Sequence, residues 1–341
     1  GHLRNASLGS TLVELYRKLG YKTISANYIG DIGAHVAKCL WAMQKFHVDE
    51  QPPKGKEGAW LGELYVEGHQ KTGLDDVAKE ESKEILRKLE SGDVELKALW
   101  EKTKAWSMEL FKRIYKDFGI DFDVWYFESE VEESGKEVVK ELLEKGIAKE
   151  SQGAIIVDLE DEDLGIFLIL RTDGTSLYAT KDLALAKQKF AEHDLDESII
   201  VVDNRQSQHF KQLFRTLELH GFNKPMKHVS YEMVDTKDGA MSSRLGNVIK
   251  YEDVRDQVFE KLQKETKERH PDWDKEKIDE VAHGIMLAAL KFMMLKSDSN
   301  KIITFDMDAA LSFEGYTGPY IQYSYARIQS MIREAGVGKP S

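Results

Sequence analysis

The sequence predicts an α/β fold with parallel strands, interrupted by a largely helical insertion and followed by helices alone. Strand and helix patterns alternate over residues 6–47 and again over residues 171–235. The block between them is mostly helical, and beyond Asn247 the pattern is helical throughout. Strands that alternate with helices favour a parallel sheet, because each helix returns the chain to the starting edge of the next strand.

The first module contains one strand with a helix before it and a helix after it. Leucines recur at helical spacing over residues 6–19, and Gly20 ends that helix. KTISANYIG is typical of a strand and ends in the GDIG turn at 30–33, after which a helix covers 34–47. The proline-containing stretch QPPKGKEG marks a boundary, so the first half of the α/β domain is assigned to residues 1–50.

Residues 51–165 form the predicted insertion. A long helix around 93–118 carries a broad apolar face, and a shorter helix runs to Gly146. GAIIVDL and LGIFLIL lie on either side of an acidic EDED and predict a β-hairpin.

The second half of the α/β domain is assigned to residues 166–250. TSLYAT is predicted as a strand before the helix DLALAKQKFAEH, ESIIVVD as a strand before QHFKQLFRTLELHG, and KHVSYEMVD as a strand before a polar loop. Helices are then predicted over 251–269, 276–296 and 319–335.

Composition excludes several classes of protein. The 341 residues are 41% hydrophobic, enough for a sizeable core, and no apolar run reaches the ~18 residues of a membrane span. Without a signal peptide pattern, a cytoplasmic protein with no membrane partner is expected. The net charge of −12 argues against a general binder of polyanions. Residues 128–164 carry much of this negative charge, with 13 acidic and four basic side chains. A nucleic acid could therefore still bind to other parts of the chain, which are closer to neutral.

The single cysteine, Cys39, excludes internal disulfides and zinc sites built from several thiolates, and no metal site is predicted from side chains. Cys39 lies among apolar residues and is expected to pack rather than react. The sequence also contains neither G-x-x-x-x-G-K-[ST] nor G-x-G-x-x-G, so another element must hold phosphates if a nucleotide binds.

Two stretches are candidates for contacting phosphates. His2 in GHLR stands at the start of a helix, where free N–H groups and the helix dipole favour anions, although a histidine there is often only solvated. DGAMSSRLGN at 238–247 places Ser242, Ser243 and Arg244 between glycines, and its alternative is an ordinary polar turn.

Two further stretches carry polar residues at strand ends, where open α/β sheets bind ligands. DNRQSQHFKQLF delivers Gln206 and His209 into the start of a helix. TDGTSLYATKDLALA places Tyr178 at a strand end and Asp182 in a first helical turn behind the cap Thr180. Asp182 is alternatively no more than a favourable partner of the helix dipole.

In this order, the four stretches resemble the class I arginyl-tRNA synthetases. GHLR is similar to the second half of their His-x-Gly-His motif, and DGAMSSRLGN to their KMSKS loop. ANYIGDIG and the segments around Tyr178 and Gln206 resemble the strand, turn and arginine site of the family. LSFEGYTGPYIQYSYARI at 311–328 resembles the junction into the anticodon-binding domain. The resemblance runs from residue 1 to about 335 and implies a Rossmann-like catalytic domain.

The resemblance implies that L-arginine and ATP, with Mg²⁺, form arginyl-adenylate, and that the arginyl group then passes to tRNA(Arg). Arginine activation that depends on bound tRNA is also implied. Asp182 is expected to accept the substrate guanidinium in bidentate fashion, and Asp31 is a weaker additional candidate. The implied sites are catalytic His2, Ser242, Ser243 and Arg244; ATP-binding Gly1, His2, His209, Met241 and Ser242; and arginine-binding Tyr178, Asp182 and Gln206.

The loop departs from the KMSKS pattern, because Ala240 and Ser243 occupy the two lysine positions and Arg244 is the motif's only cation. The same resemblance implies that residues 251–318 contact the tRNA stem and that 319–341 begin the anticodon-binding domain. An internal fragment of a longer, monomeric enzyme is expected, with low or no activity by itself. Two alternatives stay open: a synthetase-like protein that only binds RNA or a partner, and a synthetase for another amino acid, in which Asp182 would be an unpaired buried charge.

Overall fold

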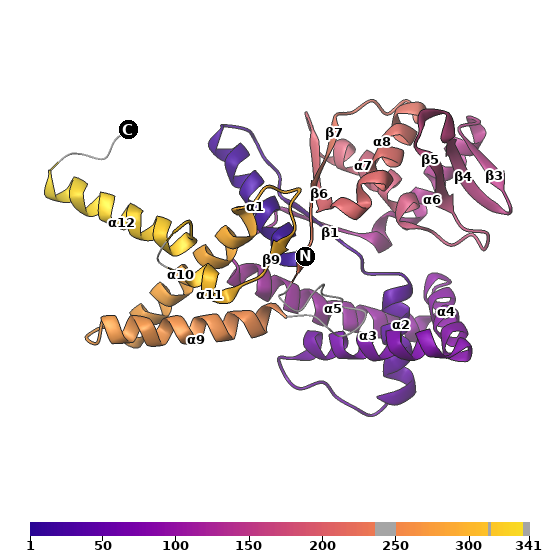
Figure 1. Ribbon diagram of the computed structural model, residues 1–341. Helices are drawn as coiled ribbons and strands as arrows, with labels where there is room; N and C mark the ends of the chain where they lie inside the picture. The colour runs from indigo at the N-terminus through magenta and orange to yellow at the C-terminus, as the bar shows by residue number, and fades with distance from the viewer. Residues whose placement is uncertain (236–249, 313–314, 337–341) are drawn as a thin grey trace. The chain divides into compact units, whose positions relative to one another are not determined.

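The structure is a computed structural model that describes residues 1–235, 250–312 and 315–336 (Figure 1). These residues divide into two compact units. The α/β unit comprises residues 22–108 and 122–231, and the helical unit comprises residues 1–21, 109–121 and the chain from 232 onward. Helix α5, Val94–Asp117, contributes to both.

The α/β unit contains parallel strand pairs, as predicted. Its remaining elements are β1 Ala26–Ile29, α2 Ala34–Phe46, α3 Glu57–Leu74, α4 Asp76–Glu90, β2 Val124–Phe127, α6 Glu128–Glu144, β3 Ala148–Ser151, β4 Ala154–Leu159, β5 Gly165–Leu170, α7 Tyr178–Glu192, β6 Ser198–Asp203, α8 Ser207–His220 and β7 Met226–Tyr231, with short 3₁₀ turns at Glu160–Glu162 (η1) and Asn204–Gln206 (η2). β1 pairs with β2 and β6 with β7, both in parallel. The predicted hairpin is confirmed as the antiparallel pair β4 and β5, with β3 added at its edge.

Strand β2 was not predicted. The sequence VWYF follows a long helix and is too short to show a clear alternation, so the sequence predicts only helices in this block before the later hairpin. Its parallel pairing with β1 brings the start of α6 to the carboxyl end of a strand, beside the turn that follows β1.

The predicted strand TSLYAT is wrong. Only Ser176 makes an isolated bridge, to Leu170, and α7 already begins at Tyr178. The Thr180 side chain accepts a hydrogen bond from the Leu177 N–H (3.0 Å) and donates one to the Ile169 carbonyl. Thr180 is therefore the third helical residue rather than the cap, and this tertiary contact overrides a local strand preference.

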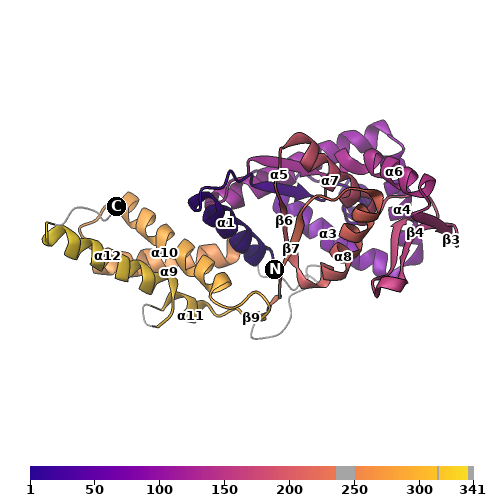
Figure 2. The same cartoon turned by 90° about the horizontal axis from the view of Figure 1, so that it is seen from above.

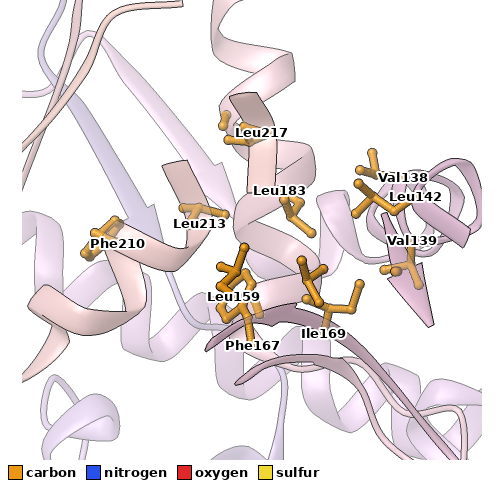
Figure 3. Packing of buried hydrophobic residues seen from close by; sticks show 14 residues of the cluster. Val138, Val139, Leu142, Leu159, Phe167, Ile169, Leu183, Phe210, Leu213 and Leu217 are labelled. Carbon is orange, nitrogen blue, oxygen red and sulfur yellow. The ribbon is translucent and has the colours of Figure 1, made fainter. Parts of the chain in front are cut away.

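One hydrophobic core joins helices α6, α7 and α8 to strands β4 and β5, and its side chains converge in Figure 3. Helix α6 crosses α7 closely at Gly135, where a Cβ atom would lie 2.5 Å from the Thr180 carbonyl oxygen. The core therefore fixes the amino-terminal ends of α7 and α8, which carry the predicted site. The labelled members are Val138, Val139, Leu142, Leu159, Phe167, Ile169, Leu183, Phe210, Leu213 and Leu217.

The helical unit is built around α10. Its elements are α1 His2–Lys18, β8 Val234–Asp235, α9 Tyr251–Arg269, α10 Lys275–Leu295, β9 Ile303–Thr304, α11 Met307–Leu311 and α12 Gly318–Glu334. Helix α10 packs against α1, α9 and α12 (Figure 2). The three helices predicted here are confirmed to within one residue, whereas β9 was missed and pairs in parallel with β8. Within the described residues, no helix has the length and apolar character to cross a membrane.

Candidate functional site

Asp182 and His209 form the centre of the candidate site. Asp182 is the fifth residue of α7, beyond the first turn, and His209 is the third residue of α8. Their side chains are 15% and 22% exposed, and His209 Nε2 lies 2.7 Å from Asp182 Oδ2. The imidazole also packs edge-on against Phe167. His209, predicted on the ATP side, therefore contacts the carboxylate predicted to receive a guanidinium.

The Asp182 carboxylate keeps capacity for a ligand. Across the described parts of the chain, no protein hydrogen bond reaches its Oδ1 atom. An ionised carboxylate has about four acceptor sites on its two oxygens, and a guanidinium presents donors in a matching planar fork. Helix α7 also carries Tyr178, 63% exposed and one turn before Asp182, on the same helical face. Gln206 is exposed at the end of η2, one turn before His209.

A second carboxylate, Glu128, lies close to this centre and was missed by sequence reasoning. It is the first residue of α6, and its Oε2 lies 3.0 Å from Lys181 Nζ, with both side chains more than nine-tenths buried. Burial raises the pKa of Glu128, Lys181 opposes that rise, and the charge of Asp182 adds to it. The available signal was the position of FESE directly after the unrecognised strand β2.

Asp31, the weaker candidate, is occupied by the protein itself. Its side chain is only 2% exposed. Oδ2 accepts hydrogen bonds from Lys104 Nζ and the Ser129 hydroxyl, both at 2.6 Å, and Oδ1 accepts from the Ser129 N–H at 2.9 Å. The Trp100 indole N–H donates to its main-chain oxygen at 2.6 Å. Asp31 thus caps the first turn of α6 and positions Glu128 rather than offering a free carboxylate.

The predicted phosphate-binding start of the chain lies in the helical unit. Helix α1 begins at His2, four residues before the predicted start, so Gly1 is its N-cap and His2 is exposed to solvent. The buried Arg4 anchors this end. Its guanidinium donates to the main-chain oxygens of Glu232 (2.5 Å), Lys301 (2.7 Å) and Asp298 (3.0 Å). Met241, Ser242, Ser243 and Arg244, which belong to the predicted loop, lie outside the described residues.

Two other observations bear on site chemistry. No cluster of three or more His, Cys, Asp or Glu side chains suited to a metal ion occurs within residues 1–235, 250–312 and 315–336. Cys39 is partly buried, its thiol lies 3.5 Å from the Leu61 carbonyl oxygen, and burial raises its pKa to about 12. The thiol is therefore protonated and unreactive, as its apolar surroundings predicted.

Comparison with known proteins places the chain in a family. The model of the class I tRNA synthetases (R), catalytic domain, matches residues 1–307. The arginine–tRNA ligase of Bdellovibrio bacteriovorus is 41% identical over 98% of this chain and 59% of its own length. The corresponding ligase of Bacteroides thetaiotaomicron is 38% identical over 98% of this chain and 60% of its own length. The chain therefore spans about three fifths of these relatives.

Solved structures agree with this placement. Thermus thermophilus arginyl-tRNA synthetase matches with a TM-score of 0.81 and 26% identity, covering 100% of this chain and 62% of that one. The arginyl-tRNA synthetase of Plasmodium falciparum, at 22% identity, has a TM-score of 0.80, covers 99% of this chain and 56% of that one, and shows the fold alone. The α/β fold predicted from the sequence is confirmed.

Proposed function

Because the chain belongs to the family of class I tRNA synthetases (R), catalytic domain, we propose that it binds L-arginine and ATP and serves in attaching arginine to tRNA(Arg). The observation that carries this proposal is Asp182, a largely buried carboxylate with an oxygen left open, next to the second carboxylate Glu128. A guanidinium is permanently charged and planar, so carboxylates recognise it better than any neutral side chain.

In the first step, a carboxylate oxygen of arginine attacks the α-phosphorus of ATP, and pyrophosphate leaves. The arginyl group of the adenylate then passes to the terminal ribose hydroxyl of the tRNA, and AMP leaves. No protein nucleophile is needed, so the residues act by holding substrates and stabilising charge. Asp182 and Glu128 hold the guanidinium, while Tyr178 and Gln206 line the pocket.

The phosphate side of the proposal rests on the family resemblance. Gly1 and His2 at the start of α1 are proposed to offer N–H donors to ATP, and His209, Met241, Ser242, Ser243 and Arg244 are further residues that the resemblance assigns to ATP binding or catalysis. The buried Arg4 supports the assignment of Gly1 and His2, because it ties the start of α1 to the segments that directly precede β8 and β9. Mg²⁺ would be held chiefly by the phosphate oxygens and would neutralise their charge.

We also propose a division of the chain into functional segments and a cellular setting. The chain divides into catalytic halves at 1–50 and 166–250, an insertion at 51–165, a tRNA-stem region at 251–318 and the start of an anticodon-binding domain at 319–341. The enzyme acts as a monomer in the cytoplasm.

The experiment is ATP–pyrophosphate exchange with arginine, with and without tRNA(Arg), beside direct calorimetric titration of arginine. Arginine, and neither lysine nor the uncharged analogue citrulline, is expected to bind and to support exchange. Titration keeps the proposal testable if the chain turns over slowly. Absence of arginine binding in the presence of ATP and tRNA would contradict the proposal.

A further inference from the structure

Tyr28 and Tyr126 lie side by side on neighbouring strands of the α/β unit. They are direct partners in the parallel register of β1 and β2, so their side chains lie on the same face. Both rings pack in one hydrophobic cluster with side chains of α6 and α7, among them Val131, Ala184 and Leu185. The two tyrosines therefore share their backbone setting and most of their apolar environment.

Their hydroxyl groups differ. Tyr126 donates a hydrogen bond to Glu192 Oε2 at 2.9 Å. The Tyr28 hydroxyl is fully buried, and no group in the described parts of the chain forms a hydrogen bond with it. Buried polar atoms in folded proteins almost always have a partner, which is protein, ordered water or a bound ligand. We therefore expect the Tyr28 hydroxyl to have a hydrogen-bond partner other than the described protein atoms.

The surroundings of Tyr28 indicate the charge of that partner. The carboxylates of Asp182, Glu128 and Asp31 act on its hydroxyl, in that order of strength, and Tyr178 contributes further. Burial is the main cause that raises the pKa of Tyr28, and these negative charges raise it more. The phenol therefore stays neutral and its oxygen keeps lone pairs to accept hydrogen bonds. A cation rich in N–H donors fits this position, because the carboxylates attract it and the oxygen accepts from it.

We propose that Tyr28 is a further ligand of the substrate guanidinium, its hydroxyl oxygen accepting one N–H while Asp182 and Glu128 accept others. This inference rests on the proposed function, because arginine supplies the guanidinium. A guanidinium has five N–H donors in a plane, and one carboxylate cannot accept from all of them. A third acceptor beside Asp182 and Glu128 can therefore bind a donor that would otherwise lack a partner. The oxygen adds specificity for a multidentate donor over the compact ammonium of lysine.

The matched variants Tyr28→Phe and Tyr126→Phe test this assignment. Each removes one hydroxyl and leaves the ring in place. The Kd for arginine and the thermal unfolding midpoint are measured for both variants and for the unsubstituted protein. Tyr28→Phe is expected to raise the Kd about 10-fold or more, since hydrogen bonds to charged groups are strong, without lowering the unfolding midpoint. Tyr126→Phe is expected to lower the midpoint and to leave the Kd unchanged.

The outcomes separate this proposal from the function on which it rests. If the unsubstituted protein fails to bind arginine, the proposed function itself fails. If it binds arginine and Tyr28→Phe keeps that affinity, water alone completes the hydroxyl, and the proposal is overturned while the function stands. A Tyr28→Phe protein that loses stability as Tyr126→Phe does would show an internal partner and would equally overturn it. A weaker Kd with unchanged stability supports it.

Discussion

Two carboxylates of the α/β unit, at the turn after β1 and near the start of α7, are both largely buried but differ in what they contact. Asp31 receives three hydrogen bonds from Lys104 and Ser129 on its two oxygens. Asp182 is contacted through Oδ2 by His209, and no described group bonds to its other oxygen. Asp31 therefore stabilises the fold, whereas Asp182 has an oxygen available for a ligand, since a buried charge needs a partner from the protein or from a ligand.

The largest effect is expected for Asp182→Asn on arginine binding. Removing one partner of a close, desolvated charge pair costs about 2–5 kcal/mol, so the affinity should fall by several hundred-fold. The fold should change little, because His209 is the one described residue that forms a hydrogen bond with the Asp182 side chain. Calorimetric titration of arginine measures the effect. Asp158→Asn is the matched control, since its Lys149 pair is exposed and should leave the affinity unchanged.

Asp31→Asn should have the opposite profile. It breaks a contact to Lys104, which is 22% exposed, and weakens the cap on α6, so unfolding should become easier by about 2–3 kcal/mol, less than for a fully buried pair. Urea denaturation measures this change. Arginine affinity should fall less than in Asp182→Asn, through displacement of Glu128. A variant that keeps its stability and loses arginine binding as Asp182→Asn does would reverse the two roles.

His209→Gln is expected to have an intermediate effect. The imidazole orients Asp182 from 2.7 Å, and a glutamine amide reaches the same position but lacks the rigid ring that packs on Phe167. Arginine should bind about 3- to 10-fold more weakly, because Asp182 is then held less firmly, a loss on the scale of about 1 kcal/mol. The affinity of the variant should be measured beside its circular dichroism spectrum. Unchanged affinity in a folded variant would show that His209 does not position the carboxylate.

The smallest effect is expected at His47, where another imidazole meets carboxylates outside the site. Its nitrogens lie 2.6 Å from Glu50 Oε2 and 2.7 Å from Glu67 Oε2, and these hydrogen bonds raise the pKa of His47 above its ordinary 6.5. Since the folded pKa is raised, the contribution to stability is complete below pH 6.5 and is lost as the pH rises through the folded value.

For this partly exposed contact the contribution should be about 1 kcal/mol or less. Unfolding midpoints of the unsubstituted protein and His47→Gln, compared across pH 5.5–9 on the scale where histidine titrates, should therefore converge at the alkaline end. Arginine affinity should be the same in both. A loss of arginine affinity in His47→Gln would show that this contact also supports ligand binding, and it would contradict the assignment of the site to Asp182 and His209.

Local patterns sufficed to predict most helices and the β4–β5 hairpin, because their apolar periodicity is long enough to be distinctive. They favoured Asp182 over Asp31 as the guanidinium acceptor, but they did not show that the protein itself already satisfies Asp31. Both follow strand-like segments in polar stretches, and their difference depends on donors distant in the chain, such as Lys104 and Ser129. Glu128 was missed for a related reason. Its position depends on β2, and the four residues of β2 can be identified as a strand only from their pairing with β1, which is distant in the sequence.

Selection of a guanidinium by the open Asp182 carboxylate is the property on which the proposed site depends. Its most direct test is calorimetric titration of arginine and of citrulline, whose ureido group has a similar shape and no charge, into the unsubstituted protein and into Asp182→Asn. A preference for arginine of about 100-fold or more is expected in the unsubstituted protein, in keeping with a desolvated charge pair, and a much smaller preference in the variant, where Glu128 is the remaining carboxylate. Full retention of that preference in Asp182→Asn would contradict it.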